Sequence, residues 1–215
     1  MKKIILLVVG FLLHSCTKEN SRVVQKQDSQ IQKPDSVLIE RKDTVQKNLS
    51  KEETLKKLND GILKALKAKD YRSLADNIHP EKGVRFSMYG YINPARDKKF
   101  SLSDFRKYVY SNTKFTFGER DGSGDIYVVS IKDYLAKWVF KRDFTTGQYL
   151  LNHFRGEGNS LNNLKEIYPG ADFTENYIAG SEKYSGMDWN SLRLVFEEFN
   201  GRYYLIAVVN DEWTI

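Results

Sequence analysis

The chain contains few side chains of the kinds that bind metals or act as nucleophiles. It has one cysteine, Cys16, and only two histidines beyond its N-terminal segment, His79 and His153, which lie far apart. Zinc sites need several His, Cys or carboxylate ligands, commonly at short spacings. The triplet His79-Pro80-Glu81 has the H-x-E pattern of zinc deaminases, but no P-C-x-x-C segment accompanies it. We therefore predict no metal site and no bound cofactor.

Two glycine-containing segments match only part of a known motif. Residues 121–125, Asp-Gly-Ser-Gly-Asp, begin like an EF-hand loop, but Ile126 and Lys132 stand where Gly and Glu are needed. A hairpin turn is the favoured interpretation. Residues 156–160 lack the third glycine of a dinucleotide-binding loop, and we interpret them as a loop in which Ser160 caps the next helix. No G-x-S-x-G segment occurs, so we name no catalytic residue.

The N-terminus has the three zones of a secretory signal. Lys2 and Lys3 precede an apolar run over residues 4–13, which is shorter than the roughly 20 residues that span a bilayer. The segment Leu13-His14-Ser15-Cys16 resembles the lipobox of bacterial lipoproteins. That resemblance implies acylation of Cys16 and cleavage just before it. The alternative is a free or buried cysteine after an ordinary signal peptide, although an exposed lone thiol would be reactive.

The residues after Cys16 indicate which membrane would hold the protein. Position 17 is Thr and not Asp, which argues against retention at an inner membrane, and Lys18-Glu19 is similar to a surface-export signal of Bacteroidota lipoproteins. We expect a lipid anchor in the cell envelope, at the outer membrane, with the periplasmic and surface faces both left open.

Composition divides the chain into a tether and one domain. Residues 17–50 contain no aromatic residue, and such a polar stretch buries too little apolar surface to offset its ordering entropy. We predict a signal peptide at 1–15, the lipidated Cys16 with a flexible tether at 16–50, and one domain at 51–215. Without Lys2 and Lys3 the net charge is +4, and no Lys/Arg run suggests nucleic acid as a partner.

Capping and periodicity predict the elements of the domain. Ser50 and Glu53 form a capping box before an apolar stripe that continues to about Lys69. The other predicted elements are a short helix capped by Asp70 and stopped by Pro80, a strand at 83–88 extending towards 91, a helix at 101–110, a strand around 115–117, a strand at 126–129, a helix opened by Ser130, and strands to the end.

The clearest element is a C-terminal hairpin at Asn200-Gly201, because a type I′ turn needs positive φ at both positions. A regular two-residue loop would place one apolar face on the core: Leu192, Leu194, Phe196, Leu205, Ala207 and Val209. The opposite face is mixed, which is not expected of a fully solvated face. We predict that a second subunit, in a homodimer, or another segment of the chain covers it. The candidate interface residues are Arg193, Val195, Glu197, Tyr204, Ile206 and Val208.

The order of helices and strands predicts an α+β fold. It resembles the NTF2-like cone, in which N-terminal helices pack on a curved, mostly antiparallel sheet. Local segments resemble a group of uncharacterised bacterial envelope proteins: residues 63–71, 79–87, 158–160, 168–170, 188–197 and 209–215. The NTF2-like resemblance implies an apolar pocket, and it is compatible with a dimer formed through the sheet.

The same resemblance suggests where proton transfer or ligand binding could occur, since some NTF2-like enzymes place an Asp or His base opposite a Tyr. The candidates of these types in this chain are Tyr89, Tyr91, His153, Glu175 and Asp211. No spacing singles out a pair among them.

The missing catalytic motifs favour a membrane-anchored domain that binds an unknown small molecule or an envelope protein without catalysis. Two alternatives stay open. One is a small-molecule isomerase, dehydratase or cyclase that uses a Tyr with a carboxylate or His. The other is a structural component of an envelope complex.

Overall fold

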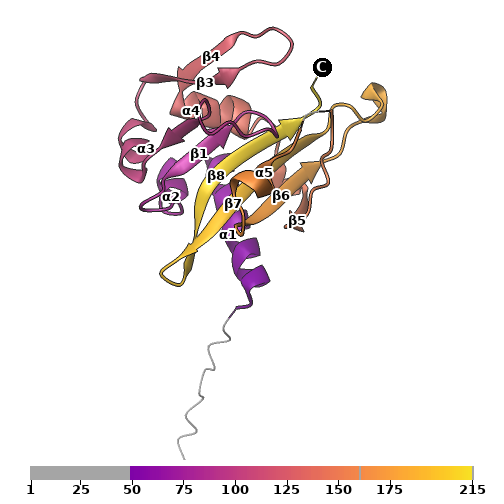
Figure 1. The fold of residues 1–215 in the computed structure, drawn as a ribbon. Helices are drawn as coiled ribbons and strands as arrows, with labels where there is room; N and C mark the ends of the chain where they lie inside the picture. The colour runs from indigo at the N-terminus through magenta and orange to yellow at the C-terminus, as the bar shows by residue number, and fades with distance from the viewer. Residues whose placement is uncertain (1–48, 160, 215) are drawn as a thin grey trace, which may run out of the picture. The chain divides into compact units, whose positions relative to one another are not determined.

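The computed structural model describes residues 49–159 and 161–214, so Cys16, most of the tether and Ser160 lie outside the described residues. Figure 1 shows the elements in chain order. The helices are α1 (Lys51–Ala68), α2 (Tyr71–Ala75), α3 (Leu102–Tyr108), α4 (Ile131–Tyr134) and α5 (Leu164–Ile167), with short helical segments η1 (Leu135–Val139), η2 (Phe144–Thr146) and η3 (Glu182–Tyr184). The strands are β1 (Val84–Ser87), β2 (Lys98–Phe100), β3 (Lys114–Glu119), β4 (Ile126–Ser130), β5 (Gln148–Leu151), β6 (Asp172–Ile178), β7 (Asn190–Phe199) and β8 (Arg202–Glu212).

Helix α1 begins and ends as its sequence predicts. The Ser50 hydroxyl accepts from the Glu53 amide, and the Glu53 carboxylate accepts from the Ser50 amide, so the capping box is confirmed. Lys69 ends the helix in the left-handed region. The apolar stripe of α1, which includes Leu55, Ile62 and Leu66, is buried. The stripe fixes the face that α1 packs on the sheet, because burial of apolar surface stabilises that orientation.

Six strands form one sheet in the order β2-β1-β8-β7-β6-β5. Only the β1–β8 pair is parallel; the other four pairs are antiparallel. Strands β3 and β4 form a separate antiparallel hairpin. The fold is therefore α+β with a mostly antiparallel sheet, as predicted. The predicted strand at 83–88 stops at Ser87 and does not continue to Tyr91.

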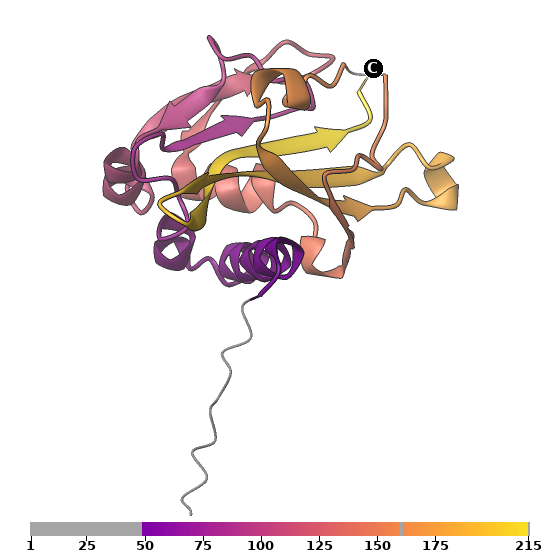
Figure 2. The ribbon, with the colours of Figure 1, turned by 60° about the horizontal axis from the view of Figure 1, so that its bottom comes forward.

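The sheet is covered on both faces. One core lies on the side of α1 to α4 and contains Ile62, Phe86, Phe105, Tyr134 and Leu194. A second, smaller core lies on the other side and contains Leu164, Phe173 and Val195. Figure 2 shows α1 beneath the sheet and α5 over the opposite face. Among the described residues, no helix is long and apolar enough to cross a membrane.

The β7–β8 hairpin differs from its predicted register beyond the first few pairs. Phe199 faces Arg202 and Phe196 faces Leu205 as predicted, but Val195 faces Ala207, so Ile206 is an extra residue. A β-bulge of one residue moves all later side chains to the opposite face. Val208 therefore packs in the helix-side core beside Leu194, whereas the residues predicted to face that core instead join the second core: Ala207 and Val209. The period-2 pattern predicted the hairpin correctly and failed at the bulge.

Candidate functional site

The five candidate residues separate into three places. Glu175 and Asp211 meet on Arg193 in the interior. Tyr89 and Tyr91 line a cavity near the β3–β4 hairpin. His153 is exposed after β5 and belongs to neither group. The structure thus forms no single site from these five residues.

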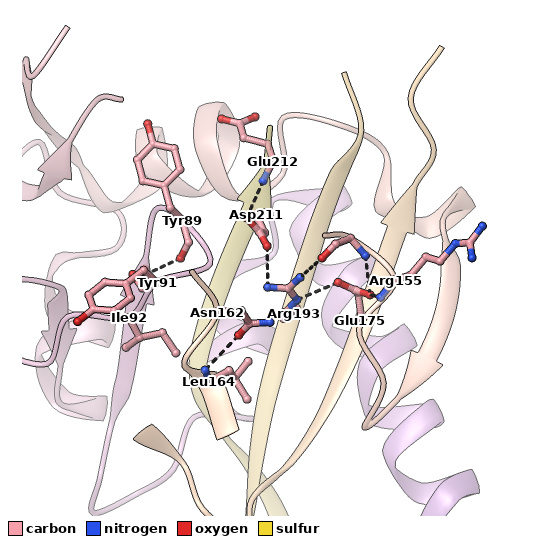
Figure 3. Close-up of polar contacts among 12 residues, drawn as sticks. Tyr89, Tyr91, Ile92, Arg155, Asn162, Leu164, Glu175, Arg193, Asp211 and Glu212 are labelled. Carbon is pink, nitrogen blue, oxygen red and sulfur yellow. Dashed lines mark hydrogen bonds and ion pairs between the residues drawn. The ribbon is translucent and has the colours of Figure 1, made fainter. Parts of the chain in front are cut away.

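Arg193 is held between two carboxylates that the sheet brings to the same place. Its Nε donates to Glu175 Oε1 at 2.8 Å, and its Nη1 lies 2.8 Å from Asp211 Oδ2. Glu175 and Arg193 are register partners on β6 and β7. Figure 3 shows the guanidinium between the two acids. We call these three residues the Arg193 cluster. Arg193 and Glu175 are fully buried, and the Asp211 side chain is 4% exposed.

The segment at residues 152–158 covers the cluster through its backbone. Arg193 Nη2 donates to the Gly156 carbonyl at 2.8 Å, and Glu175 Oε2 accepts from the Arg155 and Gly156 amides. The centroid of the Phe154 ring lies 4.8 Å from the guanidinium carbon of Arg193. Hydrogen bonds that fill the remaining positions of a buried ion pair offset its desolvation. The cluster therefore stabilises this segment and leaves no access for a ligand.

Two glycines permit the close approach of loops to this cluster. A Cβ at Gly90 would lie 2.7 Å from Asp211 Oδ2, and one at Gly156 would lie 2.5 Å from both Ser191 Oγ and the Trp189 ring. Distances below 3.0 Å are not tolerated without displacement of a neighbour. These glycines are required by packing in the interior.

The predicted interface on the hairpin requires a correction. Four of its six side chains are buried within this one chain: Arg193, Val195, Ile206 and Val208. Val195 and Ile206 are covered by Leu164 and Phe173, and Val208 lies in the helix-side core because of the bulge. Glu197 and Tyr204 stay partly exposed, and Glu197 pairs with Lys82 at 2.5 Å. The sequence predicted that either a second subunit or another segment of the chain covers the mixed face of the hairpin. In the structure, another segment of the chain covers it.

The cavity that includes Tyr89 and Tyr91 has a volume of about 210 Å³. We call it the Asp97 cavity. Its wall is formed by the end of β1, the loop that follows, β3 and the first residue of β4. The polar side chains that line it are Ser87, Asn93, Arg96, Asp97, Thr116 and Glu119, and the apolar ones include Met88, Phe117 and Ile126.

Asp97 is a partly buried carboxylate in this cavity. Its Oδ2 accepts from the Asn93 amide at 2.9 Å. Burial raises the pKa of the Asp97 carboxyl above its ordinary value, against hydrogen bonds from Asn93 and Ser87 and the charge of Arg85. Burial has this direction because it disfavours the charged form. A carboxylate with a raised pKa in a cavity is a candidate for ligand binding or proton transfer.

Tyr89 and Tyr91 line the cavity together with Asp97, and a third tyrosine, Tyr134, stacks on Phe117 of its wall. Tyr91 is 50% exposed at the cavity wall. The Tyr89 hydroxyl accepts from the Asp121 amide at 2.8 Å, and burial raises its pKa. The Tyr134 hydroxyl is buried and has no hydrogen-bond partner among the described residues. Burial raises the Tyr134 pKa well above its ordinary value, and Asp97 is the neighbouring charge that adds most to this shift.

The surface has other hollows, and these are larger than the Asp97 cavity. Two grooves of about 660 and 920 Å³ flank α1, and their walls include several exposed lysines of that helix. Within residues 49–159 and 161–214, no group of three His, Cys, Asp or Glu side chains is placed to hold a metal ion.

The central residues of the cluster and of the cavity, Arg193 and Asp97, are not among the five candidates. The hairpin pattern predicts an interface role for Arg193, although a lone arginine between Leu192 and Leu194 on a central strand is a signal of a buried ion pair. No sequence signal marks Asp97, because it lies in a loop after Asn93-Pro94 with no periodic pattern around it.

Comparison with known proteins provides no further guide. No protein-family model matches this chain, and no curated protein or solved structure shows significant similarity to it.

Proposed function

We propose that this chain is an exported, lipid-anchored envelope protein whose domain binds a small molecule in the Asp97 cavity without catalysis. The observation that carries the binding proposal is the cavity itself. Tyr89, Tyr91 and Asp97 meet there, and the carboxylate is partly buried. Concave sites with apolar walls and a few placed polar groups are typical of ligand pockets.

The other candidate places in the domain are closed or filled, and this favours the Asp97 cavity as the ligand site. The Arg193 cluster is closed, with its charged groups engaged by one another and by backbone. The concave, helix-facing core is filled by side chains such as Phe86, Phe105 and Phe117. A ligand site therefore fits best at the rim beside the β3–β4 hairpin.

We further propose that the fold is an NTF2-like cone. The support is the mixed six-stranded sheet, with α1 and α2 packed on the face opposite α5. In such a cone the Asp97 cavity would lie at the edge of the filled interior.

The anchor is supported by Lys2 and Lys3, the short apolar run and the segment Leu13–Cys16. Two or more acyl chains would hold the protein stably at a membrane, whereas one chain gives marginal binding. Cys16→Ala should abolish labelling by radioactive palmitate in the native host. Labelling that persists in this variant would refute the lipoprotein assignment.

The binding proposal is tested by filling the cavity. Small polar compounds are screened against the protein by saturation-transfer NMR, with Thr116→Trp as the test variant. Thr116 lines the cavity, and its cross-strand neighbour Val128 does not, although both are exposed. Compounds that bind the wild type and Val128→Trp but not Thr116→Trp would support the proposal. If no compound separates the two variants, the cavity is not a binding site.

A second function, acid–base catalysis by an isomerase, dehydratase or cyclase, is favoured by one observation. The raised pKa of the Asp97 carboxyl in a cavity is suited to proton transfer. A compound found in the screen would then be converted by the wild type and not by Asp97→Asn. A compound recovered unchanged after long incubation would support binding alone.

A further inference from the structure

The charges around the Asp97 cavity are unbalanced in favour of carboxylates. Asp97 and Glu119 both line it, and Arg96 is the only Lys or Arg side chain among its lining residues. Arg96 Nη2 lies 3.3 Å from Glu119 Oε1, and its side chain is 71% exposed. The one cation of the wall is therefore already paired with Glu119, at the solvent side.

Arg85 approaches Asp97 from behind the cavity and does not neutralise its carboxylate directly. Arg85 Nη1 donates to the Pro94 carbonyl at 2.9 Å and to the Asp97 backbone carbonyl at 3.4 Å. Its Nε donates to the Tyr168 hydroxyl at 3.2 Å. Arg85 is not among the residues that line the cavity, so its charge lowers the Asp97 pKa only from a distance.

The uncharged part of the wall suits the carbon chain and the cation of one ligand. Met88, Phe117 and Ile126 provide apolar surface. Tyr91, half exposed at the wall, presents an aromatic ring of the kind that attracts cations. A volume of about 210 Å³ limits the ligand to a small molecule.

A buried tyrosine packs behind one part of this wall. The Tyr134 ring stacks on Phe117 with centroids 3.7 Å apart, and Phe117 lines the cavity. The Tyr134 hydroxyl is fully buried, and no described residue is its hydrogen-bond partner. This stacking fixes the Phe117 ring in the wall, and Tyr134 itself does not line the cavity.

We propose that the Asp97 cavity binds a small primary alkylammonium ion, whose N–H groups donate to the Asp97 carboxylate and whose carbon chain lies on Met88, Phe117 and Ile126. This inference rests on the proposed binding function. Hydrogen bonds between charged groups are about twice as strong as neutral ones, which makes a half-buried carboxylate a selective partner for an ammonium group.

The proposal has a defined pH dependence. Binding requires the ionised Asp97, and burial raises the pKa of that carboxyl. The charged groups that face it are Arg85 on β1, Arg96 in the loop and Glu119 on β3, with the hydroxyls of Tyr134 and Tyr168 nearby. At a pH where Asp97 is protonated, binding must release that proton to solvent. Affinity should therefore rise with pH through the Asp97 pKa, while the amine stays protonated.

The test uses n-butylammonium chloride as the probe, with n-butanol and sodium butyrate as matched neutral and anionic probes. Each is titrated by NMR into the detergent-solubilised full chain, its Asp97→Asn variant and Asp125→Asn. Asp125 is an exposed carboxylate in the turn between β3 and β4, and it does not line the cavity. We expect Asp97→Asn to weaken n-butylammonium binding about tenfold or more, and Asp125→Asn to leave it unchanged.

The outcomes separate the inference from the proposed function. If Thr116→Trp abolishes binding of butanol or butyrate while n-butylammonium binds no better than either, the ligand class is wrong and the cavity remains a binding site. If Thr116→Trp weakens the binding of no probe and no screened compound, both the proposed binding function and the proposed ligand class are wrong. Wild-type affinity for n-butylammonium at about pH 4, near the ordinary pKa of an aspartate, and at about pH 7 gives a check that needs no Asp97 variant. Equal affinities would overturn the inference.

Discussion

The Arg193 cluster and the Asp97 cavity contain the same kinds of groups in opposite states. In the cluster, one guanidinium and two carboxylates are almost fully buried and bonded to one another and to the backbone. In the cavity, the Asp97 carboxylate is partly buried, and the arginine of the wall, Arg96, is paired with a second carboxylate, Glu119. The cluster holds the segment at residues 152–158 on the sheet, whereas Asp97 in the cavity accepts from the Asn93 amide and stays partly exposed.

The difference shows how burial separates structural from functional charge. Charges in the interior must be paired, because an unpaired ion there costs several kcal/mol. Charges at a rim can remain only partly satisfied at a modest cost, and a ligand can then complete their bonding. Stability therefore explains Glu175 and Asp211, whereas a binding role is what we propose for Asp97.

Loss of Arg193 should give the largest effect in the domain. Arg193→Met leaves Glu175 and Asp211 buried without their counter-ion, and we expect the free energy of unfolding to fall by about 3–5 kcal/mol. Urea-induced unfolding followed by tryptophan fluorescence measures this change. The matched control is the triple variant with Glu175→Gln and Asp211→Asn added, which removes the unpaired charges and should recover part of the loss. A loss under about 1 kcal/mol in Arg193→Met would show that water reaches the cluster.

Much of the fold could be predicted from local patterns. The capping box at Ser50, the stripe of α1 and the Asn200-Gly201 turn each depend on residues near in sequence, and each is confirmed. Strand β2, at Lys98–Phe100, was not predicted, because three residues with two lysines show no period. The bulge at Ile206 was missed for a related reason. No residue type marks it, and it is favoured by packing on both faces of the sheet.

The sites were less predictable, because they depend on residues distant in sequence. Arg193 and Glu175 become partners only through the β6–β7 register, and Asp211 joins them from β8. The identity of Arg193 within an apolar strand was a usable signal. The Asp97 cavity had none, since its walls come from the loop after β1 and from the β3–β4 hairpin, which no local pattern brings together.

Glycine substitutions should give an intermediate effect that follows the same contrast. Gly156→Ala would force a methyl group against Ser191 and Trp189 beside the cluster, and we expect a loss of about 1–3 kcal/mol. Gly61→Ala is the matched control, because this glycine is exposed in the middle of α1 and its Cβ would have no neighbour within 4 Å. It should instead stabilise the protein by up to about 1 kcal/mol through helix propensity. Equal effects of the two substitutions on urea-induced unfolding would contradict the tight packing at Gly156.

The smallest expected effect is found by replacing one carboxylate from each region with its amide and comparing the changes in stability. Glu175→Gln would place an amide NH₂ against the Arg155 and Gly156 amides or Arg193, and should cost about 1–3 kcal/mol. Asp97→Asn keeps an oxygen that can accept from the Asn93 amide, so its stability should stay within about 1 kcal/mol of the wild type.

The stability difference between Asp97→Asn and the wild type should depend on pH. This dependence distinguishes a partly desolvated carboxylate from a well solvated one. The folded pKa of Asp97 is raised above its ordinary value of 3.8. The folded state therefore holds this proton more tightly, and its contribution to stability, fully present below the unfolded pKa, is lost as pH rises through the folded pKa. Asn cannot ionise, so the stability of Asp97→Asn relative to the wild type should increase between about pH 4 and about pH 7 in urea titrations. A difference that stays constant, or falls, over this range would show that the carboxylate is well solvated. In that case the cavity would lack the partly desolvated charge on which its proposed selectivity for an ammonium ion depends.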